Sequence, residues 1–541
     1  MDIGFHFRGD VLAAALFLVC LVIARTSLSS PAWRARTKGH ALPPGPHRLP
    51  FIGNLLDMPK SQPWRGFRDL CLKYGETTYL QVMGRHIVVL GSARAISEFL
   101  ERRASNTSDR LVTPVVRLTG IDWLIGLMPY GPVWRAHRRA LWQHIRPAVV
   151  PTYHPVQRTV TRMFLLDLFH KPEDLKQHVR LAIAATILKV TYGIDADDEC
   201  HEIIQMIDAA IEGSAQALIP GRFLVDAVPL LQYVPAWFPG AGFQKTFARW
   251  REKISRMKSE VLLKTRNAAS VYSSLHIRIY EQYLTIVPQT EKVQPGPTPI
   301  VEALAAQSMS VPTGIDVDTL IEDVAAVAFV AGTDTTHTTA FSAFVALSMY
   351  PEVQQRAQAE LDAVVGRHRL PDFDDREALV YVRAVIMESL RWHNVTPLGI
   401  PHRTVADDEI QGYFIPAGTI VVPNIWACMH DPTEYEDPGE FRPERFMREG
   451  KIDTTVRDPF TIVFGSGRRI CPGRYFANDM LFLTIASVLH TFNIEPQVVD
   501  SNGQPVRAES QITDGALSYL EDYRCTMKPR YSDADLLRLL T

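Results

Sequence analysis

The sequence predicts a mainly α-helical protein with small β-sheets, an α+β fold. Residues 321–350 are predominantly apolar, with acidic residues near their start, as expected of a long helix through a protein core. Residues 475–489 repeat their apolar side chains at helical spacing. The strand-like segments are short by comparison and lie at residues 78–82, 86–90 and 420–423.

The chain is long enough to bury a large core. Of its 541 residues 46% are hydrophobic and 21% charged, which excludes a disordered protein. Length alone would allow three or four domains of about 150 residues. Because no linker rich in Gly, Ser or Pro divides the later part, we expect one large domain over residues 43–541, after a separate segment at residues 1–42. The net charge of -2 gives no reason to expect a nucleic-acid partner.

One of six scattered cysteines, Cys471, lies in a glycine- and arginine-rich run at residues 464–474. The cysteines lack C-x-x-C spacing, which suits a reducing compartment. A thiolate that binds iron needs backbone N–H groups directed at its sulfur, because these hydrogen bonds temper its charge. Gly467 and Gly473 flank the cysteine where positive φ or a close approach costs a glycine little. The alternative is an ordinary buried structural cysteine.

Two further side chains of this run suit a haem. Arg469 presents a planar guanidinium that matches a carboxylate, and haem carries two propionates. Phe464 would shield the thiolate side from water.

A second pattern lies inside the long predicted helix, at residues 331–336. Ala331 and Thr335 are four residues apart and share a helix face, with Gly332 beside them. Gly332 costs about 1 kcal/mol of helix stability relative to alanine, and a close approach by oxygen over the haem would explain it. The Thr335 hydroxyl can bond back to the helix and open a local bulge. The alternative is a buried polar helix that satisfies its own hydrogen bonds.

Two pairs elsewhere have helical spacing. Trp134 and Arg138 are four residues apart and would share a helix face. The alternative is an ordinary basic helix on the surface. Glu388 and Arg391 are three residues apart, and an exposed pair of that kind would contribute only about 0.3 to 0.5 kcal/mol.

The run at residues 464–474 resembles the haem-binding signature of the cytochrome P-450 superfamily of haem-thiolate monooxygenases. The resemblance implies the cytochrome P-450 fold, a triangular helical domain with a long central helix over the haem, here as the catalytic domain. Residues 52–56 and the cysteine run are most similar to the fungal secondary-metabolism type. Five family motifs occur in the family's order, at residues 134–138, 331–336, 388–391, 443–446 and 464–474.

The resemblance also implies roles for individual residues. Cys471 would be the axial metal ligand of haem b, and Asp334 would relay protons from solvent while Thr335 offers its hydroxyl to oxygen. His402 matches a position that binds a propionate, with Arg403 as the alternative donor. The implied haem-binding residues are Cys471, Trp134, Arg138, His402, Arg469, Phe464, Gly467, Gly473, Ala331 and Gly332; the implied structural residues are Glu388, Arg391 and Arg445.

The N-terminal segment suggests a membrane anchor. Residues 11–24 carry no charge and are followed by basic residues, which predicts that the downstream side stays cytosolic. The span is short for a membrane helix, which needs about 20 apolar residues, so a signal peptide or a buried helix are alternatives. Residues 43–46 form a proline-rich connector. We expect a single anchor in the endoplasmic reticulum membrane with the catalytic domain facing the cytosol.

Two other segments stand out. Residues 220–243 are rich in large apolar side chains, and either pack inward or meet lipid as the family's lid does. Residues 267–299 lack a clear helical period and are expected to be a surface insertion or, alternatively, an unspliced intron, which sequencing of the transcript would decide.

The expected activity is insertion of one oxygen atom from O2 into a hydrophobic small molecule, a secondary metabolite such as a terpenoid or polyketide. Because no convincing G-x-G-x-x-G nucleotide site is present, electrons are expected from an NADPH-dependent reductase acting on a monomer. The basic side chains at residues 135, 139 and 146 would form its landing surface. The alternatives are haem-thiolate chemistry without net oxygenation, as in a dehydratase or isomerase, and a non-catalytic membrane-tethered carrier.

Overall fold

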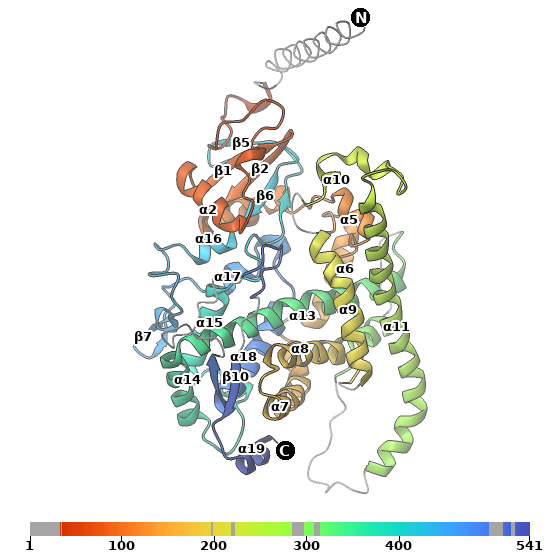
Figure 1. The fold of residues 1–541 in the computed structure, drawn as a ribbon, viewed down its shortest axis with the longest axis vertical. Helices are drawn as coiled ribbons and strands as arrows, with labels where there is room; N and C mark the ends of the chain where they lie inside the picture. Colours follow the sequence, from red (N-terminus) through yellow and green to blue (C-terminus); the bar gives the residue numbers. More distant parts are fainter. Residues whose placement is uncertain are drawn as a thin grey trace, which may run out of the picture.

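A computed structural model describes residues 33, 35–195, 198–217, 222–283, 297–307, 314–496, 512–520 and 525–540. Helices make up most of it, and the four-stranded sheet lies toward one end (Figure 1). The expected anchor at residues 11–24 lies outside the described residues. Within the described ranges, no helix combines the length and apolar character needed to cross a bilayer.

The long central helix is α13 (Val317–Met349), which crosses the middle of the molecule in Figure 1. It begins after Asp316, whose side chain accepts a hydrogen bond from a backbone N–H of the first turn at 2.9 Å. It ends before Pro351, the first residue of α14 (Pro351–Val364), because a residue preceding proline disfavours helical geometry. This confirms the helix predicted at residues 321–350.

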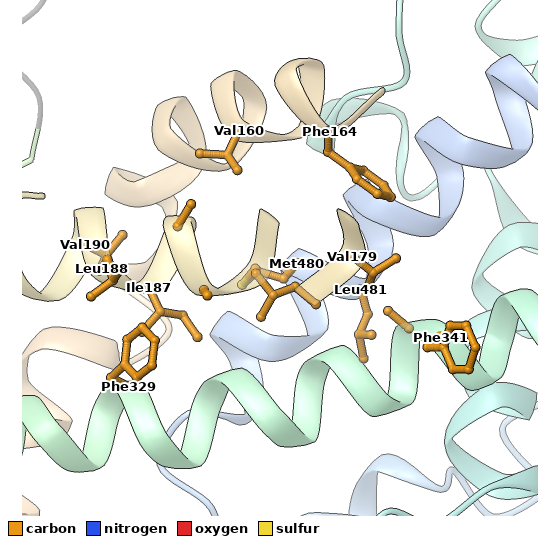
Figure 2. Close-up of a cluster of buried hydrophobic side chains, with 14 of the residues drawn as sticks. Val160, Phe164, Val179, Ile187, Leu188, Val190, Phe329, Phe341, Met480 and Leu481 are labelled. Carbon is orange, nitrogen blue, oxygen red and sulfur yellow. The ribbon is translucent and has the colours of Figure 1, made fainter. Parts of the chain in front are cut away.

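Helices α8 (Leu175–Tyr192) and α18 (Arg474–Thr491) pack against α13, and α7 (His154–His170) packs on α8 and α18 in turn. Figure 2 shows their buried side chains meeting, with Ile187 of α8 directed at α13. Helix α18 confirms the helix predicted at residues 475–489. This four-helix core holds α13 and the start of α18 in fixed relative positions.

The main sheet has the strand order β1 (Thr77–Val82), β2 (Arg85–Leu90), β6 (Ile420–Pro423) and β3 (His402–Arg403). β1 pairs antiparallel with β2, and β3 pairs antiparallel with β6, whereas β2 and β6 run parallel to each other. The three predicted strands are confirmed.

Residues 415–419 read from the sequence as a hairpin turn that leads into the strand at residues 420–423, and this prediction is wrong. β5 (Tyr413–Ile415) pairs with β4 (Asp408–Ile410), not with β6. The physical reason is that β6 already has a partner on each side, β2 and β3. Residues 416–419 therefore connect two different sheets.

The apolar segment near residue 230 is divided between inward and outward side chains. It lies between α9 (Asp198–Ala217) and α11 (Gly242–Tyr283). Val225 is buried, and the Phe223 ring lies 4.8 Å from that of Phe247. The side chains exposed on this segment are Leu224, Val228, Leu230, Tyr233, Trp237 and Phe238. The inward alternative thus holds for part of the segment, and contact of the exposed part with lipid stays a prediction.

Helix α11 continues through residue 283, so the expectation that residues 267–283 lack helical structure is wrong. Residues 284–296 lie outside the described residues. Whether residues 267–299 are an insertion stays a prediction.

The remaining elements connect these parts. They are η1 (Leu55–Asp57), α2 (Pro63–Tyr74), α3 (Ala93–Ile96), η2 (Ser97–Arg102), α4 (Ala104–Thr107), α5 (Pro114–Thr119), α6 (Pro132–Ile145), η3 (Val150–Tyr153), α10 (Leu224–Ala227), η4 (Pro229–Tyr233), α12 (Ile300–Ala306), η5 (Phe373–Asp375), α15 (Val380–Trp392), α16 (Ile425–Met429), η6 (Pro443–Phe446), β7 (Met447–Arg448), β8 (Lys451–Ile452), α17 (Phe460–Val463), η7 (Gly467–Arg469), β9 (Phe492–Pro496), β10 (Cys525–Pro529) and α19 (Asp533–Leu540).

Candidate functional site

Cys471 lies in a tight loop between η7 and the N-terminus of α18. Its backbone N–H donates to the Phe464 carbonyl at 2.7 Å, which closes the loop. Gly467 has φ +61°, and a Cβ there would lie 1.9 Å from the Leu100 carbonyl oxygen. Both a positive φ and a close approach therefore require this glycine, as predicted.

Gly473 differs from the expectation. Its φ is -83°, and a Cβ would make an ordinary 4.0 Å contact with the Cys471 sulfur. It stands at the N-cap of α18, where no left-handed conformation is needed. The second positive φ of the loop belongs instead to Gly465, at +78°, which sequence reasoning did not single out.

The surroundings of the Cys471 sulfur oppose one another. Burial raises the pKa of the thiol, whereas the N–H groups of Gly473 and Arg474 and the guanidinium groups of Arg138 and Arg474 act to lower it. The N–H groups and the guanidinium groups thus favour the thiolate, which is the form that binds metals. The loop thus already supplies the stabilising donors that a thiolate ligand needs.

We expect Gly467→Ala to cost about 2 to 5 kcal/mol of folding stability and to reduce haem content, because the backbone must move and adopt a strained φ. Urea denaturation and haem absorbance measure both effects. Gly473→Ala is the matched control and should change stability far less, since its Cβ has room. Equal losses in the two variants would contradict this reading.

Arg469 and Trp134 lie against each other beside this loop. The guanidinium is 4.4 Å from the Trp134 ring centroid, and it donates to the carbonyls of Ser108, Ile125 and Met128 at 2.8, 3.1 and 2.8 Å. Burial lowers the pKa of Arg469 to about 10. Arg138 of α6 donates to the Ile470 carbonyl. The structure therefore brings the predicted pair of α6 to the cysteine loop.

His402 and Arg403 are adjacent residues of β3, but their side chains have different surroundings. His402 is buried, and its Nδ1 lies 2.8 Å from the Thr107 carbonyl. Burial and the neighbouring Arg110 guanidinium hold the pKa of His402 well below its usual range. Arg403 instead points to the surface and lies 3.9 Å from Asp109. Of the two alternative donors, only His402 joins the cluster.

Arg110 also belongs to this cluster, and sequence reasoning missed it. It is buried, donates to the carbonyls of Ile400 and Pro401, and has a pKa held well below its usual range by burial and by Arg469. Its Nε and the Nε1 of Trp134 are buried without a hydrogen-bond partner in the part of the chain that the structure describes. No motif distinguishes this arginine from a surface one in the sequence.

The cluster of Arg110, Trp134, Arg138, His402 and Arg469 therefore has excess positive charge and unused N–H donors. Asp109 is the carboxylate that acts on Arg110 and Arg469, and it cannot balance three guanidinium groups. Buried charges and donors normally have partners. The two propionates of a haem fit this arrangement.

The middle of α13 borders an internal space. Ala331 is exposed although Thr333 and Asp334 are buried. The Thr335 hydroxyl donates to the Ala331 carbonyl at 2.8 Å, as expected, but the helix continues without a bulge. A Cβ on Gly332 would lie 2.9 Å from the Ile187 side chain of α8. A Cβ there would thus press on the tip of the Ile187 side chain, and the expected approach of oxygen to this glycine stays a prediction.

Asp334 is held by two partners from distant parts of the chain. Arg180 of α8 donates to Oδ1 at 2.8 Å, and the Tyr519 hydroxyl donates to Oδ2 at 3.3 Å. Sequence reasoning missed both, because no spacing relates them to α13. Among the described residues, no hydrogen bond joins Asp334 or Thr335 to the Cys471 loop, so the acid–alcohol pair and the sulfur are separate parts of the site.

Glu388, Arg391 and Arg445 form a buried ionic cluster. Arg391 donates to both oxygens of Glu388 at 2.7 and 2.8 Å, and Arg445 donates to Oε1 at 3.2 Å. Arg391 also bonds the carbonyls of Met429 and Pro438 at 2.9 and 2.8 Å. These contacts tie α15 to the segment that leads to the cysteine loop.

Comparisons with known proteins give one consistent family. The family model described as Cytochrome P450 matches residues 43–511. Cytochrome P450 monooxygenase COX1 of Coprinopsis cinerea is 36% identical over 97% of this chain and 98% of its own length. Cytochrome P450 monooxygenase 208 of Postia placenta is 35% identical over 97% and 96%. Tryptamine 4-monooxygenase of Psilocybe cyanescens is 36% identical over 95% and 98%.

Proposed function

Since the chain belongs to the cytochrome P450 family of haem monooxygenases, we propose that Cys471 is the thiolate ligand of its haem b. The converging N–H groups and guanidinium groups around the sulfur carry this proposal. When bound, the haem supplies the activation of O2 and the insertion of one oxygen atom into substrate.

The propionates are proposed to bind the cluster of Arg110, Trp134, Arg138, His402 and Arg469. The unpartnered Nε of Arg110 and Nε1 of Trp134 supply donors without further rearrangement. His402 can donate through Nε2 only when protonated, because its Nδ1 already faces a carbonyl. The negative charge of two propionates would favour that protonated form.

Asp334 and Thr335 are proposed to deliver protons to oxygen in the internal space beside Ala331. Thr335 already holds its hydroxyl at this face, and Asp334 is anchored one residue earlier. This acid–alcohol pair favours oxygenation over the dehydratase, isomerase and carrier alternatives, which have little need for proton delivery.

The test is product formation by purified protein with an NADPH-dependent reductase and O2. Asp334→Asn should lower turnover by roughly 100-fold, because general acid catalysis typically contributes that much or more, while haem spectra stay unchanged. Asp316→Asn, on the same helix, is the control, since asparagine is an equally good N-cap. Reductase-dependent NADPH consumption without any oxygenated product across a broad panel would contradict the proposal.

The reductase is proposed to bind the exposed guanidinium groups near the cysteine loop. Arg135, Arg139, Arg146 and Arg468 are exposed there. Complementary charge accelerates such encounters.

The substrate is proposed to be a hydrophobic secondary metabolite such as a terpenoid or polyketide. Because one relative is named for tryptamine, aromatic amines belong in the panel of test substrates.

A single N-terminal anchor in the endoplasmic reticulum membrane, with the domain facing the cytosol, is also proposed.

A second contact with the membrane is proposed at the segment near residue 230. Trp237, with 79% of its surface exposed, and Leu230 of the same segment give an apolar surface suited to lipid. In vesicles containing brominated lipid, Trp237→Phe should remove a substantial part of the tryptophan quenching. Trp64→Phe, a change in the buried core, should not. Unchanged quenching in the first variant would place this segment in water.

A further inference from the structure

A cavity of about 190 Å³ lies away from the haem cluster, where α2, the C-terminal end of α15, α16 and residues 512–520 meet. None of the residues assigned above to haem or proton delivery lines it. Its walls include Trp392 and Trp426, with Arg65 and Arg68 beside them. Its volume slightly exceeds the roughly 150 Å³ of an apolar protein cavity that takes up benzene.

The charge around this cavity is positive. The guanidinium groups of Arg65 and Arg68 lie 5.4 and 5.2 Å from the Trp426 ring centroid. None of the described residues that line the cavity is acidic. Burial and nearby arginines hold the pKa of His430 well below its usual range. The neutral imidazole therefore stacks on Trp426, at 4.2 Å between ring centroids, and adds no charge of its own.

Two polar groups of the wall have unmet hydrogen-bonding capacity. Asn394 is only 4% exposed; its Nδ2 donates to the Leu390 carbonyl at 2.8 Å, but its Oδ1 has no partner among the described residues. The Nε of Arg65 is likewise buried without a partner there. The wall thus offers one charged donor and one acceptor, and buried groups of this kind are normally satisfied.

We propose that this cavity is a second ligand site, which binds a small aromatic carboxylate bearing a ring hydroxyl or ring N–H. The carboxylate would accept from Arg65, the hydroxyl or N–H would donate to Asn394 Oδ1, and the ring would lie against the indole rings of Trp392 and Trp426. The Arg65 guanidinium, whose Nε has no partner among the described residues, favours an anion, whereas Arg68 already pairs with Asp69 at 3.2 Å. The flat indole walls favour an aromatic ring.

The cavity is coupled by hydrogen bonds to the neighbouring loops. The backbone N–H of Trp426 donates to the Pro397 carbonyl at 3.0 Å, and the backbone N–H of Ser518 donates to the Val395 carbonyl at 2.7 Å. A ligand here would therefore contact Trp426 and Ser518, which are hydrogen-bonded to residues 395–397.

The test is titration calorimetry of the haem-containing full chain with 4-hydroxybenzoate. One molecule should bind per chain, and binding should persist when imidazole occupies the distal side of the haem. Benzoate, which lacks the hydroxyl, and 4-hydroxybenzamide, which lacks the charge, should each bind several-fold more weakly. Loss of binding in imidazole would assign the ligand to the haem pocket and overturn the proposal, as would equal affinity for all three compounds or no binding of any.

Variants locate the site. Arg65→Gln should weaken 4-hydroxybenzoate binding roughly tenfold or more, because it removes a charge-assisted hydrogen bond. Arg367→Gln is the matched control: this surface guanidinium also lies over a ring, 5.8 Å from Tyr531, but not at the cavity. Unchanged affinity in folded Arg65→Gln, or an equal loss in both variants, would overturn the proposal. Haem content verifies folding of each variant, and the compound series tests the proposal independently of them.

Discussion

Replacing Cys471 with serine is expected to abolish the red-shifted Soret band of the reduced carbon monoxide complex and with it the oxygenase activity. A serine hydroxyl does not ionise at neutral pH, and it lacks the sulfur whose charged form the groups of Gly473, Arg474 and Arg138 favour. The thiolate is what donates electron density to the iron in this family. The difference spectrum of the variant beside wild type measures the effect directly.

Cys71→Ser is the control for this experiment. Cys71 is buried beside the sheet, where burial raises its pKa to about 11, so it remains a thiol and its replacement should leave the band intact. If Cys471→Ser kept the band, or if folded wild type with bound haem lacked it, Cys471 would not be the ligand.

Replacing Glu388 with glutamine is expected to destabilise the protein by about 3 to 5 kcal/mol, the cost of leaving buried charges without their partner. Arg391 has 0% side-chain exposure and donates to both carboxylate oxygens of Glu388, and Arg445 donates to one of these oxygens as well. A neutral amide cannot balance either guanidinium. Urea denaturation measures the loss, and haem content should fall with it.

The surface pair Glu377 and Arg383 offers a matched comparison. Their atoms are 2.7 Å apart, but Glu377 is largely exposed, and such pairs contribute at most about 1 kcal/mol. Glu377→Gln should therefore be nearly neutral. A loss for Glu388→Gln no larger than this would show that the buried cluster is not a structural lock.

The parts of the candidate site that follow one another in the chain could be predicted. Trp134 and Arg138 share a helix face because of their spacing, and Gly467 was singled out for a close approach that the Leu100 carbonyl indeed makes. Arg110 and Arg180 could not be predicted, since their roles depend on segments far away in sequence. The same holds for Gly332, whose neighbour Ile187 belongs to another helix.

The fold was predictable to a similar extent. Apolar periodicity indicated α13 and α18, which are long and local. Strand partners were not: residues 415–419 read as a hairpin turn leading into the strand at 420–423, yet β6 pairs with β2 and β3, which come from elsewhere in the chain. A turn signal specifies a reversal of the chain, and only the tertiary structure determines which strands pair across it.

The excess positive charge near the cysteine loop has a consequence for how the protein persists in a cell. Arg110, Arg138 and Arg469 lie in a buried site, where burial lowers the pKa of each, so a bound dianion would offset part of the cost of their charges. A ligand that binds only the folded chain stabilises it in proportion to the logarithm of its free concentration. The half-life of newly made protein should therefore follow the haem supply, so that haem biosynthesis limits how much of this enzyme accumulates.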